Sequence, residues 1–283
     1  MRLKTALVSL LLICPCAYSY GQLRFSSVGG EQGYSAMRAV YEADLDNGWV
    51  LVPRYGYYRM SDKEVDEKGS TSRYGAQVRY ELTDDWAALA QADWQPSAVG
   101  YRGVVYQLGT RWKPFYYWKG LKEPSVSFWA GQERSRSYVD VNGADLPDGP
   151  FRQVATTALG EIAVHAGPFD LQAAWQKVIK YKSHVPRNVT FSWAEIPYMT
   201  AVLQGYIKDC WAVRASYPAR VISPYASWAY YHYDRRNQVA AAVSAGLLVK
   251  LWDAQITGGV EVFEPRREER KKTYFSLSVD VPM

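Results

Sequence analysis

Three histidines are the side chains of this sequence best suited to acid–base chemistry near neutral pH, and one of them has a carboxylate nearby. His232 and Asp234 are two positions apart in the aromatic segment 230–234. In an extended strand, residues i and i+2 share a face, so the carboxylate could orient the imidazole for general-base work. The pair could equally be a hydrogen-bonded pair at a hairpin tip. Both residues are weak catalytic candidates, because the sequence supplies no obvious nucleophile beside them.

The other histidines and the cysteines indicate no further chemistry. His165 adjoins a turn signal at 166–168, and Ser183 would point away from His184 in a strand. Two of the three cysteines lie in an N-terminal segment expected to be removed, which leaves Cys210 alone. One cysteine makes neither an internal disulfide nor a cysteine-based metal site. We therefore expect no metal and no cofactor.

The elements that carry these residues are predicted to be strands, because apolar and polar residues alternate in segments of roughly ten residues. The last segment shows the pattern best. Its apolar face holds Phe275, Leu277, Val279, Val281 and Met283, and its polar face holds Ser276, Ser278 and Asp280. After residue 19 no apolar run approaches the length of a membrane helix. The pattern predicts an all-β protein consisting of one transmembrane antiparallel up-and-down β-barrel.

On this final segment the chain resembles Gram-negative outer-membrane β-barrel proteins, whose last strand ends in alternating hydrophobic residues that the barrel-assembly machinery reads. Met283 departs from the terminal Phe or Trp usual in that class. The resemblance is architectural and indicates no specific porin or transporter family. It implies a location in the bacterial outer membrane, contact with outer-membrane lipids and lipopolysaccharide, and the barrel-assembly machinery as a partner.

The N-terminus has the composition of a secretory signal. Arg2 and Lys4 precede an apolar run at 6–13, and Ala17 and Ser19 are small residues at the positions a signal peptidase inspects. We expect a cleaved signal peptide over 1–19 and a barrel over 20–283. Of 33 basic and 28 acidic residues, two basic ones leave with the signal, so the mature balance is +3. This balance does not indicate a nucleic-acid partner.

Tight turns and longer polar connections alternate along the chain, as in barrels with short periplasmic turns and longer extracellular loops. Turns are expected at 46–48, 83–85, 166–168, 208–209 and 252–253, and loops at 61–72, 96–101, 140–150, 182–194 and 264–272. A first strand near 22–28 and one long strand over 211–234, bent near Pro218 and Pro224, bring the total to about 14 strands. If either assumption fails, the total is about 12.

Aromatic residues make up 15% of the chain, and several lie beside the expected turns. Transmembrane barrels carry aromatic girdles at both water interfaces. The expected periplasmic girdle consists of Trp49, Trp86, Trp112, Phe169, Trp211 and Trp252. The alternative is that these rings fill the core of a soluble β-sandwich.

Where one face of a strand is apolar, the other is expected to face the barrel lumen. An Arg or Lys facing lipid at mid-membrane would cost roughly 2–4 kcal/mol, which favours this assignment. The expected lumen-facing residues are Arg38, Glu42, Arg54, Arg73, Gln77, Arg79, Glu81, Gln91, Asp93, Gln107, Arg111, Glu161, Gln172, Gln176, Arg214 and Glu261. Such charges either line an open pore or pair across a narrow lumen and close it.

The sequence therefore favours a porin-like, non-enzymatic channel for passive diffusion of small hydrophilic solutes, because a barrel of about 14 strands is wide enough that side chains need not fill it. One alternative is a closed barrel that is structural or binds a ligand or partner. The other is a lipid-modifying enzyme at the rim, centred on His232 and Asp234. The basic run at 266–272 would contact lipopolysaccharide phosphates or be a solvated loop tip.

Overall fold

The computed structural model describes residues 21–31, 34–62, 67–98, 101–114, 121–137, 151–181, 207–233, 239–264 and 270–283. The expected signal peptide and Asp234 lie outside these ranges. The described chain consists of fourteen strands and one short 3-10 turn, Asp46–Gly48. This confirms the larger of the two strand counts. No helix long and apolar enough to cross a membrane occurs in the described ranges.

The fourteen strands coincide with segments in which apolar and polar residues alternate. The first seven are β1 (Gly21–Gly30), β2 (Ser35–Leu45), β3 (Trp49–Asp62), β4 (Glu67–Glu81), β5 (Trp86–Ala98), β6 (Tyr101–Trp112) and β7 (Leu121–Ser137). The other seven are β8 (Phe151–Ala166), β9 (Phe169–Tyr181), β10 (Ile207–Ser216), β11 (Ile222–Tyr233), β12 (Val239–Leu251), β13 (Ala254–Glu264) and β14 (Lys272–Pro282).

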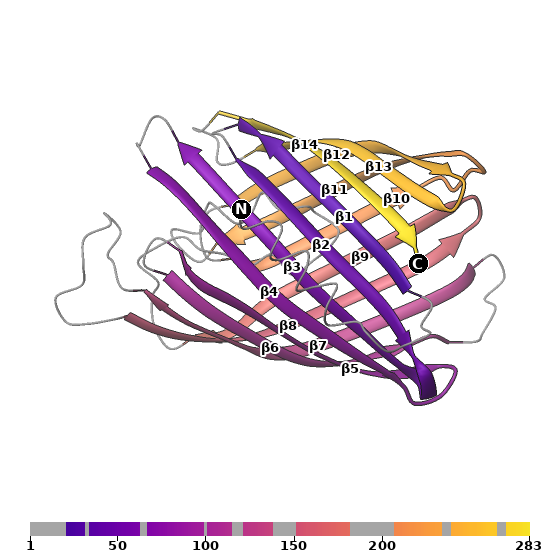
Figure 1. The fold of residues 1–283 in the computed structure, drawn as a ribbon, viewed down its shortest axis with the longest axis horizontal. Helices are drawn as coiled ribbons and strands as arrows, with labels where there is room; N and C mark the ends of the chain where they lie inside the picture. Colours follow the sequence, from indigo (N-terminus) through magenta and orange to yellow (C-terminus); the bar gives the residue numbers. More distant parts are fainter. Residues whose placement is uncertain are drawn as a thin grey trace.

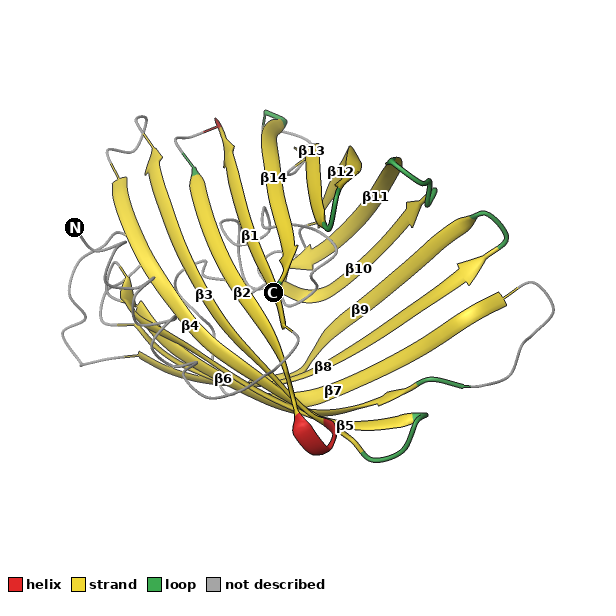
Figure 2. Cartoon of the chain, turned by 45° about the vertical axis from the view of Figure 1, so that its right-hand side comes forward, coloured by secondary structure: helices red, strands yellow, loops and turns green. Residues whose placement is uncertain are grey.

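The strands close into one antiparallel barrel (Figures 1 and 2). Each pairs with its neighbours in sequence, and the first strand, β1, pairs with the last, β14, from Gln22↔Pro282 to Gly30↔Tyr274. Two backbone hydrogen bonds between Gly21 and Met283, of 3.1 and 2.7 Å, finish this seam. Closure pairs the backbone N–H and C=O groups that the edges of an open sheet would expose. A β-sheet can span a lipid bilayer only when these groups are paired.

The two ends of the barrel differ. One end, the turn rim, carries the connections 46–48, 82–85, 167–168, 217–221 and 252–253 together with Gly21 and Met283. Asn47, Gly48, Gly167 and Trp252 have positive φ there, as tight hairpin turns require. The other end is the loop rim, which carries the C-terminal ends of β3, β5, β7, β9, β11 and β13.

The structure corrects the expected connections in two places. The expected turn at 208–209 lies inside β10, and the expected long strand over 211–234 is two strands, β10 and β11, joined by 217–221. Pro218 lies in this connection. Two hydrogen bonds close it, from Tyr217 N to Pro224 O and from Ala219 N to Ser223 Oγ. The expected loops 61–72 and 96–101 are also shorter, because β3 pairs with β4 up to Asp62↔Glu67 and β5 runs to Ala98.

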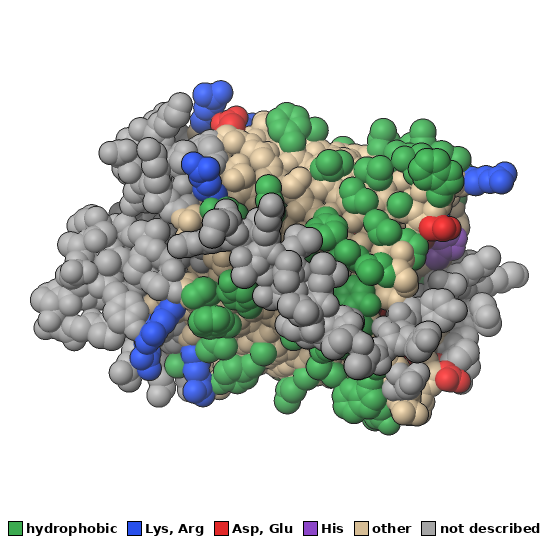
Figure 3. Space-filling model, viewed as in Figure 1, with side chains coloured by type: hydrophobic (Ala, Val, Ile, Leu, Met, Phe, Trp, Pro, Cys, Tyr) green, Lys and Arg blue, Asp and Glu red, His purple; other side chains and the backbone are tan. Residues whose placement is uncertain are grey.

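The outer wall is apolar between the rims. Trp94, Leu108 and Phe275 have exposed fractions of 54, 71 and 60%. Figure 3 shows hydrophobic side chains spread over the wall, with the coloured charged side chains near its two ends. Because strand side chains alternate, the residues between these apolar ones point into the barrel.

Aromatic rings form a belt on the outer wall near each rim. The turn-side belt includes Trp49 on Tyr80 (ring centroids 4.5 Å apart), Trp86 on Trp112, and Phe169 on Tyr217. The fully exposed Trp252 lies at the same rim. The loop-side belt contains Tyr55, Tyr74, Trp94, Trp175 and Trp211.

The spacing of the belts matches a membrane. On β5, Trp86 and Trp94 are eight residues apart, about 27 Å along a strand and about 21 Å of thickness at the usual barrel tilt. The expected place of Trp211 in the turn-side girdle is wrong. Its strand, β10, places it opposite Trp175 and Tyr230, away from the turns.

Candidate functional site in the barrel interior

All sixteen residues expected to face the lumen lie on strand faces opposite the exposed apolar side chains. Eleven of them, from Arg38 to Arg111, belong to the neighbouring strands β2 to β6. The structure brings most of these together into hydrogen-bonded networks. The other five, Glu161, Gln172, Gln176, Arg214 and Glu261, are spread over β8, β9, β10 and β13. Whether solute touches them remains a prediction.

The first network is centred on Asp93, whose side chain is 5% exposed. Arg54 Nη2 lies 3.1 Å and Arg73 Nη2 3.4 Å from Asp93 Oδ2. Arg54 also donates to Gln91 Oε1 at 3.1 Å. Arg54 and Asp93 come from strands two apart, and Gly75 of β4 lies between them in register. The absent side chain at Gly75 is what lets the two groups meet.

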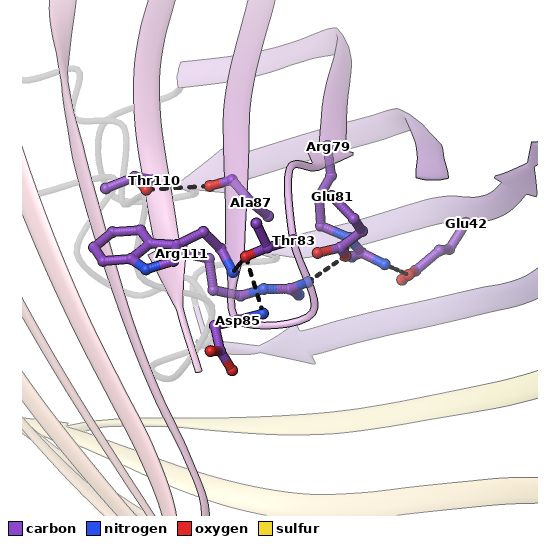
Figure 4. A network of polar contacts seen from close by, with 9 residues as sticks. Glu42, Arg79, Glu81, Thr83, Asp85, Ala87, Thr110 and Arg111 are labelled. Atoms are coloured by element: carbon purple, nitrogen blue, oxygen red, sulfur yellow. Dashed lines mark hydrogen bonds and ion pairs between the residues drawn. The ribbon is translucent and has the colours of Figure 1, made fainter. Parts of the chain in front are cut away.

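The second network runs toward the turn rim and joins three strands (Figure 4). Arg79 Nη2 donates to Glu42 Oε1 at 3.1 Å, and Arg111 Nη2 donates to Glu81 Oε1 at 2.5 Å. Arg79 Nε forms an ion pair with the same Glu81 oxygen at 2.9 Å. Glu81 and Arg111 also come from strands two apart, with the small Ala87 of β5 between them. Two acids and two arginines thus alternate along the wall, and their formal charges balance.

A third, uncharged network continues around the wall. Gln91 donates to Gln107, and Gln107 donates to Thr157 Oγ1 at 3.1 Å. Gly131 of β7 lies between Gln107 and Thr157 in register. As at Gly75, the missing side chain leaves room for residues of two strands that are not direct neighbours to meet. Gln107 and Thr157 are both 1% exposed. Burial without a partner would leave these polar groups unsatisfied, so the pairing removes that penalty.

The wall formed by β10 to β13 is different in character. Its inward positions are mainly small, with Ala212, Ala229 and Ala242 buried, and Ser227 bonds Ser244 at 2.5 Å. Arg214 stacks over the ring of Tyr225, with its guanidinium carbon 4.1 Å from the centroid. Glu261 is 8% exposed.

The expected lumen-facing set left out some inward residues, among them Asp280, which the sequence had already placed on the polar face of the last strand. Arg24 and Asp280 form an ion pair across the β1–β14 seam. Both stand on the polar faces of the first and last strands, and alternation alone could have added Arg24 to the set. Tyr58, whose hydroxyl accepts from Arg38 at 3.2 Å, and the fully buried Tyr231 and Phe263 also point inward. Their apolar character hid them, because the expected inner face was polar.

The histidines lie away from this interior network. His232 Nδ1 is 3.1 Å from Asp209 Oδ2, and both side chains stand on the outward row of β10 and β11 near the loop rim. His165 Nδ1 is 2.6 Å from Asp170 Oδ1, next to the turn at 167–168. The oriented carboxylate for His232 is therefore Asp209 in the described chain, whereas Asp234 lies outside it. Within the described ranges, no three His, Cys, Asp or Glu residues are grouped as a metal site.

Comparison with known proteins adds evidence on the fold. No protein-family model matches the sequence, and no characterised protein matches it by sequence. The CymD monoaromatic hydrocarbon channel superposes with a TM-score of 0.53 at 8% identity, covering 94% of this chain and 88% of that chain. OccAB1 of Acinetobacter baumannii gives 0.51 at 7% identity, covering 94% and 95%. The chain thus shares its fold with these two proteins. The closed barrel is the fold that its sequence predicts.

Proposed function

We propose that this protein is an outer-membrane channel for passive diffusion of small hydrophilic solutes. The observation that carries the proposal is the direction of the interior ion pairs. Arg54–Asp93, Arg79–Glu42 and Arg111–Glu81 each join strands two apart on one wall. Each of these three pairs runs along the wall, between strands on the same side of the barrel. In a barrel of this strand number, such pairing leaves the centre free for water.

The outer wall supports the location. Aromatic belts lie on both sides of an apolar band on the outer wall, as they do in transmembrane barrels. We propose that the turn rim faces the periplasm, that residues 1–19 are a cleaved signal peptide, and that β14 is read by the barrel-assembly machinery. Lipopolysaccharide contact is proposed for the loop rim, whose basic run at 266–272 lies mostly outside the described ranges.

The test is single-channel conductance of the protein purified from outer membranes and inserted into a planar bilayer. Discrete current steps in KCl, with a stable reversal potential under a salt gradient, are expected. Protein that keeps the heat-modifiable mobility of a folded barrel but passes no current would contradict the channel and favour a closed binding barrel.

The rim-enzyme alternative has its own test. A strain carrying His232→Ala is expected to keep the lipid profile of the parent, because the proposed function uses no catalysis at His232. Loss of a lipid modification in that strain would overturn the non-enzymatic assignment. Asp209→Asn, which removes the carboxylate 3.1 Å from His232, serves as the matched second variant.

A further inference from the structure

Arginines gather on the outer wall at the loop-rim end of β6, β7 and β8, which lie side by side (Figure 1). In register, Arg102 of β6 pairs with Arg136 of β7, and Arg136 pairs with Arg152 of β8. Arg134 stands two residues before Arg136 on the same face of β7. Arg102, Arg134 and Arg136 are exposed and, by strand alternation, share the outward face with Leu108. Because the Cα atoms of directly paired residues are about 5 Å apart, these three side chains form one basic area, the arginine patch.

The arginine patch lies at the edge of the loop-side aromatic belt. Val104 stands in register between Arg134 and Trp94 of that belt. The guanidinium carbon of Arg134 is 5.5 Å from the centroid of the Tyr106 ring. The Tyr106 hydroxyl donates to Gln132 Oε1 at 2.6 Å, and Arg134 Nη2 donates to the same oxygen at 3.3 Å. Because aromatic rings mark the interface of a membrane, these contacts hold Arg134 at the level where lipid headgroups begin.

The register neighbours of the arginine patch on the described strands include no acid. Arg136 has an arginine on each side, and Arg134 has a valine on each side. Another outward row at the same rim differs, because Asp209 stands there between Lys177 and His232, and its carboxylate is 3.1 Å from His232 Nδ1. Like charges directly opposite one another destabilise a pair of strands. An anion shared by the arginines would remove this repulsion.

We propose that the arginine patch binds phosphate monoester groups of lipopolysaccharide. The inference rests on the proposed orientation of the barrel, which places the loop rim in the outer leaflet, and it assigns the lipid contact to folded strands. A phosphate monoester carries a charge of about −1.5 to −2 at pH 7 and three acceptor oxygens. Two planar guanidinium groups therefore share one such phosphate through charge-assisted hydrogen bonds, whereas a phosphodiester lipid offers them a single charge. The acyl chains of the same molecule lie against the apolar band of the outer wall.

The experiment titrates the purified protein in detergent with defined lipids and counts the bound molecules by native mass spectrometry. The probes are lipid A with two phosphate groups, lipid A with both phosphates removed, and phosphatidylglycerol. Phosphorylated lipid A is expected to bind with an apparent affinity about tenfold or more above that of either other lipid. Equal binding of dephosphorylated lipid A or of phosphatidylglycerol would overturn the phosphate monoester site. Displacement of lipid A by inorganic phosphate alone would show that the patch takes free phosphate and would overturn the lipid as its ligand.

Variants separate the lipid site from the proposed channel. The double variant Arg134→Gln and Arg136→Gln is expected to bind phosphorylated lipid A about tenfold or more weakly, while it keeps heat-modifiable mobility and KCl current steps. Arg59→Gln is the matched control, because Arg59 is exposed on the outward face of β3 with Ser35 and Ser70 as register partners. It should leave lipid binding unchanged. Unaltered binding in the double variant, or an equal loss in Arg59→Gln, would refute the site. A lack of KCl current in a parent protein that still binds lipid A would refute only the channel.

Discussion

The carboxylate of Asp93 occupies the space that a side chain at Gly75 would fill. A Cβ built on Gly75 would lie 2.0 Å from Asp93 Oδ1 and 2.8 Å from its Cγ. Asp93 uses this space to reach Arg54 on the far side of β4. The same relation recurs with Ala87 between Glu81 and Arg111, and with Gly131 between Gln107 and Thr157. Small residues thus determine which polar groups of the inner wall meet.

Gly75→Ala is expected to lower the free energy of unfolding by about 1–3 kcal/mol, because the added methyl forces the Asp93 carboxylate away from Arg54. Urea titration of the protein in lipid vesicles measures this change. Gly258→Ala is the matched control, since a Cβ there meets no atom within 4 Å. Equal stability of the two variants would show that the space at Gly75 is not needed.

Glu81→Gln is expected to shift the reversal potential toward anion preference. The substitution removes the negative charge that Arg79 and Arg111 share, which leaves the inner wall more positive. Arg79→Gln should shift the potential in the opposite direction. Glu264→Gln makes the same charge change at an exposed carboxylate paired with Lys271 and should have little effect. A shift of equal size in this control would place the selectivity outside the interior network.

Leu108→Arg is expected to destabilise the barrel by about 2–4 kcal/mol, because it places a charge in lipid midway between the aromatic belts. Leu108 is 71% exposed and lies opposite Ala90, halfway between Trp86 and Trp94 on β5. Leu82→Arg, also outward but at the turn rim, should cost about 0–1 kcal/mol. Refolding equilibria in vesicles compare the two. Equal costs would contradict the assigned position of the membrane.

Asp280→Asn is expected to weaken the β1–β14 seam by about 1.5 kcal/mol through loss of the ion pair with Arg24. The value is at the low end for a charged hydrogen bond because the Arg24 side chain is 38% exposed. The readout is the temperature at which the folded band disappears in heat-modifiability gels. Asp84→Asn in the exposed 82–85 turn controls for loss of one acid. An unchanged transition would mean that backbone pairing alone closes the barrel.

Several features follow from the sequence because they depend on a local period. Alternation in the segment 275–283 identifies β14 and its two faces, and the same two-residue period places Arg79, Glu81 and Arg111 on inward faces. Turn residues such as Asn47 and Gly167 mark hairpins because few residues tolerate their backbone angles. The number of strands was also predicted correctly from the sequence. That number nevertheless included a wrong assignment, because β10 and β11 were expected to form one long strand.

The tertiary structure decided which of these residues meet. A two-residue period says which face a side chain occupies but not which residue of the next strand lies beside it. For this reason the sequence analysis placed Trp211 at the wrong rim. For the same reason the ion pairs Arg54–Asp93 and Glu81–Arg111 could not be predicted from the sequence. Register and closure are non-local, because they depend on how all fourteen strands are staggered around the barrel. The sequence alone determined the wall and its two faces, and strand register built the networks of the inner face.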